Sequence, residues 1–425
     1  MVIAGAGPAG SATALLLARR GLRVLLVDRA EFPRDKPCGD CVSPGANRLL
    51  RGWGLWDAVL ARSPALIDGW AIRCGGHGFA SRFPATDGAR PRSVALPRRE
   101  LDDVLRSAAL DAGAVPVLAD VLDVLYDGRR VTGLLCRTSA GTTTLRARLV
   151  IGADGLRSRV ARRVGAAGPA GPLRKLSLTA HVRGVRPALV RGEMHVAPGL
   201  CIGIAPVGGG ADPVHNLTVV GDARRFGRDV AADPARFVDR ALRDVDHGAA
   251  DSPAARLRDA RPAVPAPARG PRHPRFGALL ASGPFDRPTR AVTGPGWALV
   301  GDAAGYYDPF TGQGVHAALA GAELLAACAA DALERADAQP LHGYARTARR
   351  RTRSARRLQW LVESFVARPA LLAGVSERLD RAPAFLQGLL AATGDLAAPA
   401  SILRPERLAQ LVLPPRRGDA DGHDR

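Results

Sequence analysis

The stretch Val2-Ile3-Ala4-Gly5-Ala6-Gly7-Pro8-Ala9-Gly10 at the start of the chain decides the fold. It predicts a short buried strand and a glycine-rich turn that opens an Ala/Leu-rich helix over residues 11–20. A second strand over 22–27 then ends on Asp28. This order is that of a dinucleotide-binding βαβ unit, and the acid in register makes the glycine pattern specific. The sequence therefore predicts an α/β fold with a Rossmann-like domain.

Each residue of the turn has an expected role in binding the dinucleotide. Gly5 permits the tight turn, Gly7 lets a pyrophosphate approach the backbone, and Gly10 lets the helix pack closely on the strand. The helix start, with Pro8 and Ala9, presents free N–H groups to the phosphates. Asp28, followed by Arg29, can accept hydrogen bonds from both ribose hydroxyls.

Two later segments repeat the pattern of a strand followed by an acid and a turn. Gly301-Asp302-Ala303-Ala304-Gly305 follows an apolar strand at 297–300, and Val150-Ile151-Gly152-Ala153-Asp154 has the same form. An acid after a strand can bind ribityl hydroxyls, and the N–H groups of a glycine-rich helix start stabilise negative charge on a flavin ring. These segments indicate that the dinucleotide is a flavin.

Together the three segments resemble the FAD-binding signatures of the p-hydroxybenzoate hydroxylase and geranylgeranyl reductase superfamily, which is similar to the group A flavin monooxygenases. The resemblance covers residues 1 to about 330. It implies FAD as the cofactor and NADPH or NADH as the electron donor. It also implies cofactor contacts from further residues: Arg98, Asp154, Gly301, Asp302, Ala303, Pro309, Gly312, Gln313 and Gly314. For Arg98, a solvated helix start is the alternative, and Arg99 competes for the role.

The same resemblance divides the chain into domains. Residues 1–170 and 275–335 are expected to form a discontinuous FAD-binding domain of the GR2 type. Residues 171–274, with short strands at 176–184, 192–197, 200–206 and 215–222, are expected to form an inserted mixed β-sheet domain that binds the substrate. Residues 336–417 are expected to be helical, and 418–425 to be a disordered tail.

The motifs agree on the cofactor, but they point to two different reactions. Lys36-Pro37-Cys38-Gly39 is similar to the reductase branch, where the Cys-Gly turn lies close to the flavin, whereas Gly312-Gln313-Gly314 is typical of hydroxylases. Cys201 and Gly203 stand where reductases carry an aromatic pair, which predicts a wider cavity. We assign Cys38 and Gly39 as residues near the flavin. The expected substrate pocket consists of Cys201, Gly203, Pro206 and Tyr306.

From this mixture we expect an NAD(P)H-dependent flavin monooxygenase, a hydroxylase or epoxidase, that acts on a hydrophobic aromatic or polyketide-like molecule. The alternative is a geranylgeranyl-reductase-like flavoprotein that reduces C=C bonds of a prenyl or quinone-type substrate. The sequence shows no assignable catalytic base. His181, His195, His215 and His316 are candidates, although a lone histidine more often has a structural role.

Cys38 and Cys41 form a C-x-x-C pattern with three interpretations. The pair can be a redox disulfide, although the following Ser43-Pro44 differs from a thioredoxin-type helix start. It can be half of a zinc site with Cys74 and His77. It can also be one family cysteine beside an incidental one, with Cys38 as a proton donor or a small packing residue. We predict no metal.

Composition argues against other classes of protein. The formal charge of +20 suggests a nucleic-acid partner, but only two of the 60 basic residues are lysines and aromatic residues are 4% of the chain. Few aromatic platforms and a preference for Arg fit coding bias better than nucleic-acid binding. Six cysteines without a signal peptide predict a cytoplasmic protein. We expect no transmembrane helix.

The segment from Ala345 to Phe365 has seven arginines between 346 and 357 and then an apolar stretch. One interpretation is a helix that packs its apolar end on the FAD domain and leaves its arginines in water. The other is a peripheral contact with an anionic membrane, which would suit a hydrophobic substrate. The oligomeric state is not predicted.

Overall fold

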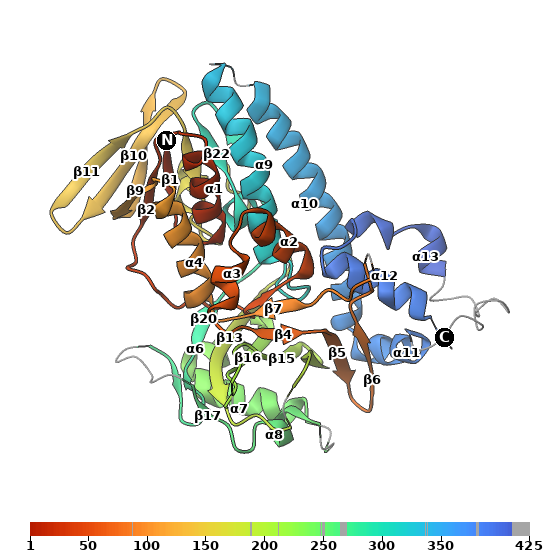
Figure 1. Cartoon of the computed structure of the whole chain (residues 1–425). Coiled ribbons are helices and arrows are strands. Elements are labelled where there is room, and N and C mark those ends of the chain that lie inside the picture. Colours follow the sequence, from red (N-terminus) through yellow and green to blue (C-terminus); the bar gives the residue numbers. More distant parts are fainter. Residues whose placement is uncertain are drawn as a thin grey trace. The chain divides into compact units, whose positions relative to one another are not determined.

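A computed structural model describes residues 1–86, 88–187, 189–210, 212–246, 248, 251–263, 270–335, 337, 339–379 and 382–409. The chain divides into two compact units, each made of segments that are distant in sequence (Figure 1). Unit 1 comprises Met1–Pro64, Leu96–Ser177 and Leu280–Arg353. Unit 2 comprises Ala65–Ala95, Leu178–Leu279 and Ser354–Arg425. The predicted tail at 418–425 lies outside the described residues.

Unit 1 is built on a six-stranded sheet in the order β21-β22-β12-β1-β2-β8. The strands from β22 to β8 are parallel, and β21 is antiparallel to β22. The central three strands are fully or largely buried, as expected for parallel strands covered on both faces. The bounds are β1 Val2–Ala4, β2 Leu25–Asp28, β8 Val115–Leu118, β12 Val150–Gly152, β21 Thr293–Gly294 and β22 Trp297–Leu299.

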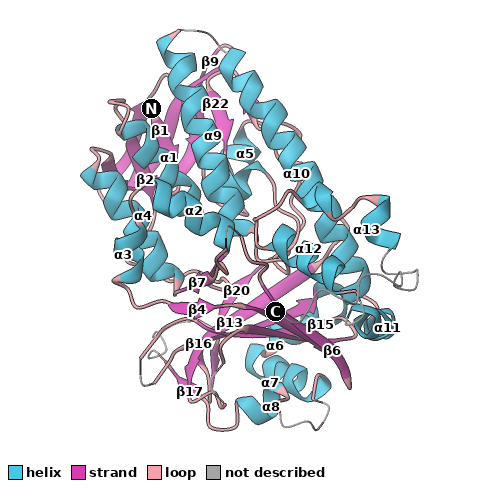
Figure 2. Ribbon diagram, turned by 45° about the vertical axis from the view of Figure 1, so that its right-hand side comes forward, coloured by secondary structure: helices cyan, strands magenta, loops and turns pink. Residues whose placement is uncertain are grey.

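Helices and a β-meander cover the sheet of unit 1 (Figures 1 and 2). Helix α1 (Pro8–Ala18) packs beside α4 (Arg98–Asp111) and α9 (Gly314–Glu334). The antiparallel meander packs on the sheet through Val131, Leu134 and Cys136, which share a buried cluster with Val2 and Val150. The remaining elements of this part are α2 Pro44–Gly52, α3 Trp56–Leu60, α5 Arg159–Arg163, β9 Asp120–Asp127, β10 Arg130–Thr138, β11 Gly141–Arg146 and the short 3-10 helix η1 Gly301–Ala304.

Unit 2 contains a mixed sheet in the order β17-β13-β16-β15-β14-β5-β6, in which β14 and β5 are parallel. One face carries Ile202, Ile204, Leu217 and Val219, which pack with Phe237 of α7 in a buried cluster. The bounds are β5 Gly69–Cys74, β6 His77–Arg82, β13 Lys175–Arg183, β14 Gly192–Ala197, β15 Leu200–Pro206, β16 His215–Asp222, β17 Arg261–Pro262, α6 Ala223–Ala232, α7 Pro234–Asp244 and α8 Pro253–Arg256.

The C-terminal part of the chain is helical. It consists of α10 Gln339–Val366, α11 Pro369–Leu379, α12 Pro383–Thr393, η2 Pro399–Ser401 and α13 Pro405–Ala409. Leu358 of α10 joins Phe79, Phe83 and Phe385 in a buried cluster that belongs to unit 2. The apolar end of the arginine-rich helix therefore packs in unit 2, whereas the sequence analysis placed it on the FAD domain.

The observed elements differ from the expected ones in instructive ways. Strands β14, β15 and β16 have the expected bounds, because each alternates or runs apolar between clear turns. Strand β8 pairs in parallel with β2, so the antiparallel meander that follows it consists of β9, β10 and β11. The division into units also differs from the expected domains. Residues 65–95 group with unit 2, because β5 pairs with β14, a strand 120 residues later in the sequence. The register of this pairing runs from Trp70↔Gly192 to Cys74↔Val196.

Helix α9 bears on the expectation of no transmembrane helix. Among the described residues it is long and apolar enough to do so by length and composition. Half of its apolar window is buried, and it packs on α1. A buried core helix of an α/β domain passes the same test, because both environments select apolar residues.

Candidate cofactor and active site

The first glycine-rich turn has the backbone conformation that its three glycines were predicted to provide. Gly5 has a φ of +100°, and a Cβ there would lie 2.5 Å from the Ala153 carbonyl oxygen. A Cβ on Gly10 would lie 1.8 Å from the Gly5 carbonyl oxygen. A Cβ on Gly7, by contrast, would meet nothing closer than Arg34 Nη2 at 3.7 Å. The fold thus requires glycine at 5 and 10, whereas the space beside Gly7 is open to a ligand.

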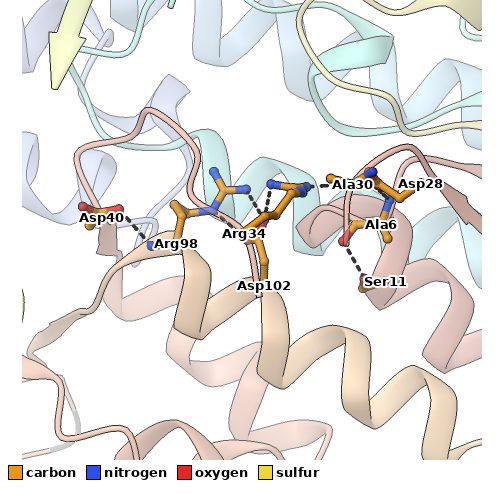
Figure 3. Close-up of polar contacts among 8 residues, drawn as sticks. All are labelled: Ala6, Ser11, Asp28, Ala30, Arg34, Asp40, Arg98 and Asp102. Carbon is orange, nitrogen blue, oxygen red and sulfur yellow. Dashed lines mark hydrogen bonds and ion pairs between the residues drawn. The ribbon is translucent and has the colours of Figure 1, made fainter. Parts of the chain in front are cut away.

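Asp28 ends β2 next to this turn (Figure 3). Its Oδ2 accepts a hydrogen bond from the Ala6 N–H at 2.8 Å, and its Oδ1 accepts one from the Ala30 N–H at 3.0 Å. Each carboxylate oxygen retains a lone pair, and the side chain is partly exposed. A cavity of about 400 Å³ opens beside it, lined among others by Phe32, Arg106 and Val117.

The wall of this cavity combines the Asp28 carboxylate, apolar side chains and the Phe32 ring, over which two guanidinium groups lie. The guanidinium carbons of Arg34 and Arg106 lie 4.7 and 5.0 Å from the centroid of the Phe32 ring. Such a site suits a nucleoside, whose base is flat and apolar and whose ribose hydroxyls donate to a carboxylate. The residues at the end of β2 therefore fit the adenosine part of FAD.

A chain of ion pairs runs from the partly exposed Asp28 to the buried start of α4 (Figure 3). Arg34 lies 3.8 Å from Asp28 Oδ2 and 3.3 Å from Asp102 Oδ2. Asp102 accepts two hydrogen bonds from Arg98, at 2.7 and 2.9 Å, and is fully buried. The backbone N–H of Arg98 donates to Asp40 at 3.1 Å. Arg98, predicted to contact the cofactor, is thus engaged by Asp102, and its cofactor contact stays a prediction.

The turn after β22 lies against the turn after β1. Gly301 has a φ of +64°, and a Cβ there would lie 2.7 Å from the Ala9 Cβ. The two glycine-rich segments, almost 300 residues apart in sequence, therefore meet at the carboxyl edge of one parallel sheet. This convergence is what a shared dinucleotide requires, because a ligand of a parallel sheet binds outside the carboxyl ends of its strands.

Asp302 in this turn has charged neighbours that sequence reasoning missed. Burial raises the pKa of the Asp302 carboxyl, while Lys36 and Arg98 act in the opposite direction. Burial and the Arg98 guanidinium lower the pKa of Lys36, and Asp302 partly compensates. Lys36 is one of only two lysines in the chain. The sequence offered two signals for Lys36, its rarity among the basic residues and its place in the Lys36-Pro37-Cys38-Gly39 segment, but neither pointed to Asp302.

The third acid, Asp154, has local partners. Its Oδ1 accepts from the Ser158 hydroxyl at 2.5 Å, and its Oδ2 accepts from the N–H groups of Arg159 and Val160. It therefore caps the start of α5, which holds the turn after β12 in place. A direct contact from Asp154 to the cofactor stays a prediction.

The loop after η1 is fixed by the second lysine. Lys175 Nζ lies 3.3 Å from Asp308 Oδ2, and Asp308 Oδ1 accepts from the Phe310 N–H at 2.7 Å. The Thr311 hydroxyl donates to Gln313 at 3.1 Å, and Gly312 has a φ of +69°. The Pro309 to Gly314 segment that leads into α9 is thus held by its own side chains, next to the turn that carries Asp302 and Ala303.

Three protonated groups gather near this loop. Burial raises the pKa of the Cys38 thiol, an effect that Arg98 opposes, and burial raises the pKa of Cys41 strongly. Burial, followed by the charges of Asp302, Asp308 and Cys38, raises the pKa of Tyr306 well above its usual value. Nothing within 4 Å would meet a Cβ on Gly39. Cys38 and Tyr306 can therefore hold protons beside an open space in unit 1.

The structure also addresses the other interpretations of the C-x-x-C pattern. None of the six cysteines, all of which lie in the described part of the chain, forms a disulfide. Within the part of the chain that the structure describes, no group of three or more His, Cys, Asp and Glu side chains is arranged to hold a metal ion. Cys74 donates a hydrogen bond to the Pro369 carbonyl oxygen at 3.4 Å. No positive support for a disulfide or a zinc site comes from these contacts.

In unit 2, the predicted pocket residues lie on β15. Cys201 and Gly203 alternate with the buried Ile202 and Ile204, so they belong to the face opposite the cluster with α7. A Cβ on Gly203 would meet no atom closer than 3.9 Å. Across the ladder from Gly203, Thr218 donates to Asn216 at 2.7 Å and lies 3.2 Å from Thr179. This face therefore has free space beside a polar strip. Pro206 ends the same strand.

Two of the candidate histidines have structural surroundings. His195 is almost fully buried, and its Nε2 lies 3.5 Å from Glu193, which also pairs with Arg256 at 2.6 Å. His215 is equally buried, and burial lowers its pKa while its Nδ1 lies 3.2 Å from the Pro213 carbonyl oxygen. Neither is exposed enough to meet a substrate.

Comparisons with known proteins agree with this geometry. The family model described as FAD binding domain matches residues 1–260. Menaquinone reductase of Mycolicibacterium smegmatis is 33% identical over 319 residues, which is 74% of this chain and 72% of that protein. Digeranylgeranylglycerophospholipid reductase 2 of Methanopyrus kandleri is 30% identical over 353 residues, 79% of this chain and 78% of that protein.

Solved structures share the fold at lower identity. The flavin-dependent brominase Bmp2 aligns with a TM-score of 0.78 and 21% identity, over 95% of this chain and 96% of that one. PqsL from Pseudomonas aeruginosa, described as a probable FAD-dependent monooxygenase, aligns with a TM-score of 0.69 and 22% identity, over 88% of this chain and 98% of that one. They show that the α/β fold of flavoproteins, predicted from the glycine-rich turns, is correct.

Proposed function

Because this chain belongs to the FAD binding domain family and is an FAD-dependent oxidoreductase, we propose that it reduces a carbon–carbon double bond of a hydrophobic isoprenoid or quinone-type molecule. NADPH or NADH is the proposed electron donor. The proposal reverses the order that the sequence pattern favoured, in which a monooxygenase came first.

The observation that carries the proposal is the extent of similarity to two reductases. The alignment to menaquinone reductase covers 319 residues and therefore extends beyond the cofactor turns. The Lys36-Pro37-Cys38-Gly39 segment, which resembles the reductase branch, lies within electrostatic reach of Asp302. One relative is a menaquinone reductase and the other a digeranylgeranylglycerophospholipid reductase, and we propose a substrate of the same quinone or isoprenoid class.

FAD, when bound, accepts two electrons from a nicotinamide and passes them on to the substrate. The Gly5–Gly10 turn and Asp28 would hold its ADP half. The Asp302 turn would hold the flavin end, with N–H groups that stabilise negative charge. Saturation of a double bond consumes one hydride and one proton, so substrate, NAD(P)H and H⁺ give the saturated product and NAD(P)⁺. Cys38 and Tyr306, whose raised pKa values keep them protonated, are the proposed sources of that proton.

The substrate class also fits the face of β15 in unit 2. The Cys201 side chain and the free space beside Gly203 suit a hydrophobic molecule, and the polar strip of Thr179, Asn216 and Thr218 can bind one polar group. We propose Cys201, Gly203 and Pro206 as substrate contacts of this face, and a contact from Tyr306 stays a prediction from the sequence. We also propose that the protein is cytoplasmic, because thiols that form no disulfide suit a reducing compartment.

Monooxygenation remains the second candidate, because Gly203 leaves the room that a fused-ring substrate needs. Reduced flavoproteins of this fold also transfer oxygen to aromatic rings or alkenes, and the Gly312-Gln313-Gly314 sequence resembles that branch. The substrate would then be a hydrophobic aromatic or polyketide-like molecule, and one oxygen atom of O₂ would enter the product while the other leaves as water.

The test is a product analysis by mass spectrometry. The purified protein, loaded with FAD, is incubated with NADPH and a menaquinone that carries an unsaturated isoprenoid chain, once without oxygen and once under ¹⁸O₂. The proposal predicts a product that gains two hydrogen atoms in both incubations. A product that forms only with oxygen and contains ¹⁸O establishes the second candidate instead.

Variants then test the proton donors. Cys38→Ala and Tyr306→Phe are expected to lower the rate of product formation at least tenfold while FAD stays bound. Cys328→Ala, a thiol on α9, is the matched control and should leave the rate unchanged. Full activity in the double variant would show that neither residue supplies the proton.

A further inference from the structure

Helix α10 has an extreme distribution of charge. Seven arginines lie between residues 346 and 357, and no acidic residue occurs between Gln339 and Val362. Arginines three or four positions apart, such as Arg349 and Arg353, face each other on a helix, and like charges at that spacing destabilise it. A helix with this arrangement, and with no acidic residue of its own between positions 339 and 362, has a surface suited to an anionic one.

The arginines are concentrated on one face. At about 100° per residue, six of the seven lie within about 80° of Trp360 around the helix axis. Of these six, all but the half-buried Arg356 are exposed. Arg351 lies opposite them, and it donates to the Ala320 carbonyl oxygen at 3.4 Å. We call Trp360 together with Arg346, Arg349, Arg350, Arg353, Arg356 and Arg357 the Trp360 face (α10, blue in Figure 1).

Trp360 differs from the nearby apolar residue Leu358 in its exposure to solvent. Its relative exposure is 62%, whereas Leu358, two residues earlier, is fully buried in the cluster of unit 2. Leu371, in the first turn of α11, is 46% exposed. The chain therefore buries one side of α10 and leaves its largest side chain in water at the end of the row of arginines. Packing does not explain that position.

We propose that the Trp360 face binds the surface of an anionic phospholipid bilayer. Arginines on the polar face of a helix attract lipid phosphates, and tryptophan partitions into the region between headgroups and acyl chains. An exposed indole and leucine have no role in binding duplex DNA through phosphates alone, so the bilayer fits the face better than a nucleic acid. The inference concerns a surface and does not depend on which reaction the flavin supports.

Vesicle co-sedimentation tests the proposal with the full-length FAD-loaded protein. Vesicles of pure phosphatidylcholine are compared with vesicles that contain phosphatidylglycerol, at low and physiological salt. The wild type is expected to sediment with the anionic vesicles and to be released by salt, because exposed charges are screened. Arg350→Gln/Arg353→Gln/Arg357→Gln should lower the partition coefficient by about tenfold or more, since each basic residue near the bilayer surface contributes.

A matched variant controls for net charge. Arg228, Arg236 and Arg243 are three exposed arginines of α6 and α7, and their replacement by Gln removes the same charge from unit 2. The control variant should bind anionic vesicles within about twofold of the wild type. Equal losses in both triple variants would mean that the overall charge of +20, and not this face, drives binding, and would overturn the proposal.

Fluorescence locates the contact independently of affinity. Brominated lipids quench tryptophans that insert into the bilayer, so they should quench the wild type and fail to quench Trp360→Phe, which retains the other four tryptophans. Quenching that persists in Trp360→Phe would overturn the proposal. So would a protein that binds duplex DNA in a gel shift but no anionic vesicle. Product formation from a dispersed substrate is measured in parallel, so a failed reaction and a failed membrane contact are told apart.

Discussion

The two units present their ligand groups in physically different ways. In unit 1, the groups that fit FAD come from turns at the ends of parallel strands, where backbone N–H groups and single acids such as Asp28 and Asp302 meet. In unit 2, the predicted substrate contacts lie on the face of a sheet, where Gly203 and Thr218 come together only through strand pairing. A dinucleotide site is therefore set by local turn chemistry, whereas a substrate site depends on long-range register.

Each unit also contains one buried Arg–carboxylate pair. Arg98 and Asp102 are 8% and 0% exposed, and Arg256 and Glu193 are both 8% exposed. The first pair connects through Arg34 to Asp28, whereas the second lies beside His195. Both pairs are buried to a similar extent, but only the Arg98–Asp102 pair connects to the residues proposed to bind the cofactor. The same substitution in each pair therefore separates an effect on folding from an effect on cofactor binding.

The largest expected effect comes from breaking these pairs. Removal of one partner of a buried pair leaves a charge unpaired, so Arg98→Met and Arg256→Met should each lower the free energy of unfolding by about 3–5 kcal/mol. Only Arg98→Met should also weaken FAD binding, because it frees Asp102 and Arg34 next to Asp28. Denaturation followed by circular dichroism and FAD titration measure the two effects. Equal losses of FAD affinity in both variants would contradict this distinction.

The next effect distinguishes the role of Gly7 in the first turn from that of Gly10. Gly7→Val should weaken FAD binding by at least about a hundredfold, roughly 2.7 kcal/mol, while the apoprotein keeps its melting temperature within a few degrees. The reason is that a side chain at Gly7 meets open space in the structure, where the pyrophosphate is expected. Gly10→Val is the contrast, and it should fail to fold because its Cβ overlaps the Gly5 carbonyl. A yellow, fully loaded Gly7→Val protein would refute the assignment of this turn.

These predictions reflect how differently the two units could be derived from sequence. The Gly5–Gly10 turn and Asp28 were predictable because glycine spacing and an acid at a strand end encode one local geometry. The ion pair from Arg98 to Asp102 and the second role of Arg34 were missed, because burial of a charged side chain depends on what packs over it. The pairing of β5 with β14 was missed for a related reason, since nothing local records a partner 120 residues away.

A smaller effect tests the sheet face of unit 2. Gly203→Phe should raise KM for the unsaturated menaquinone about tenfold, or about 1.4 kcal/mol, and leave FAD affinity unchanged, because the new ring fills the free space beside Thr218. Gly227→Phe on α6 serves as the control. Steady-state kinetics and FAD titration provide the two readouts. An unchanged KM in Gly203→Phe would remove this face from the substrate site.

The smallest effect is a pH dependence of unit 2. Burial lowers the pKa of His215 and of His273 in the folded protein, so the unfolded chain binds more protons near the ordinary pKa of about 6.5. Stability is therefore fully present above that pH and falls as the pH drops below it, by at most about 1.4 kcal/mol per pH unit for each histidine. His215→Gln should flatten the curve of unfolding free energy against pH.

The central claim is that the turns after β1, β2 and β22 bind one FAD through its ADP half as well as its flavin. Titration of the apoprotein with FAD and with FMN, followed by flavin fluorescence, tests it most directly. We predict one FAD per chain and binding of FMN at least about a hundredfold weaker, because FMN has no adenosine for the cavity at Asp28. Equal affinities for the two flavins, or an apoprotein that takes up neither, would contradict the account.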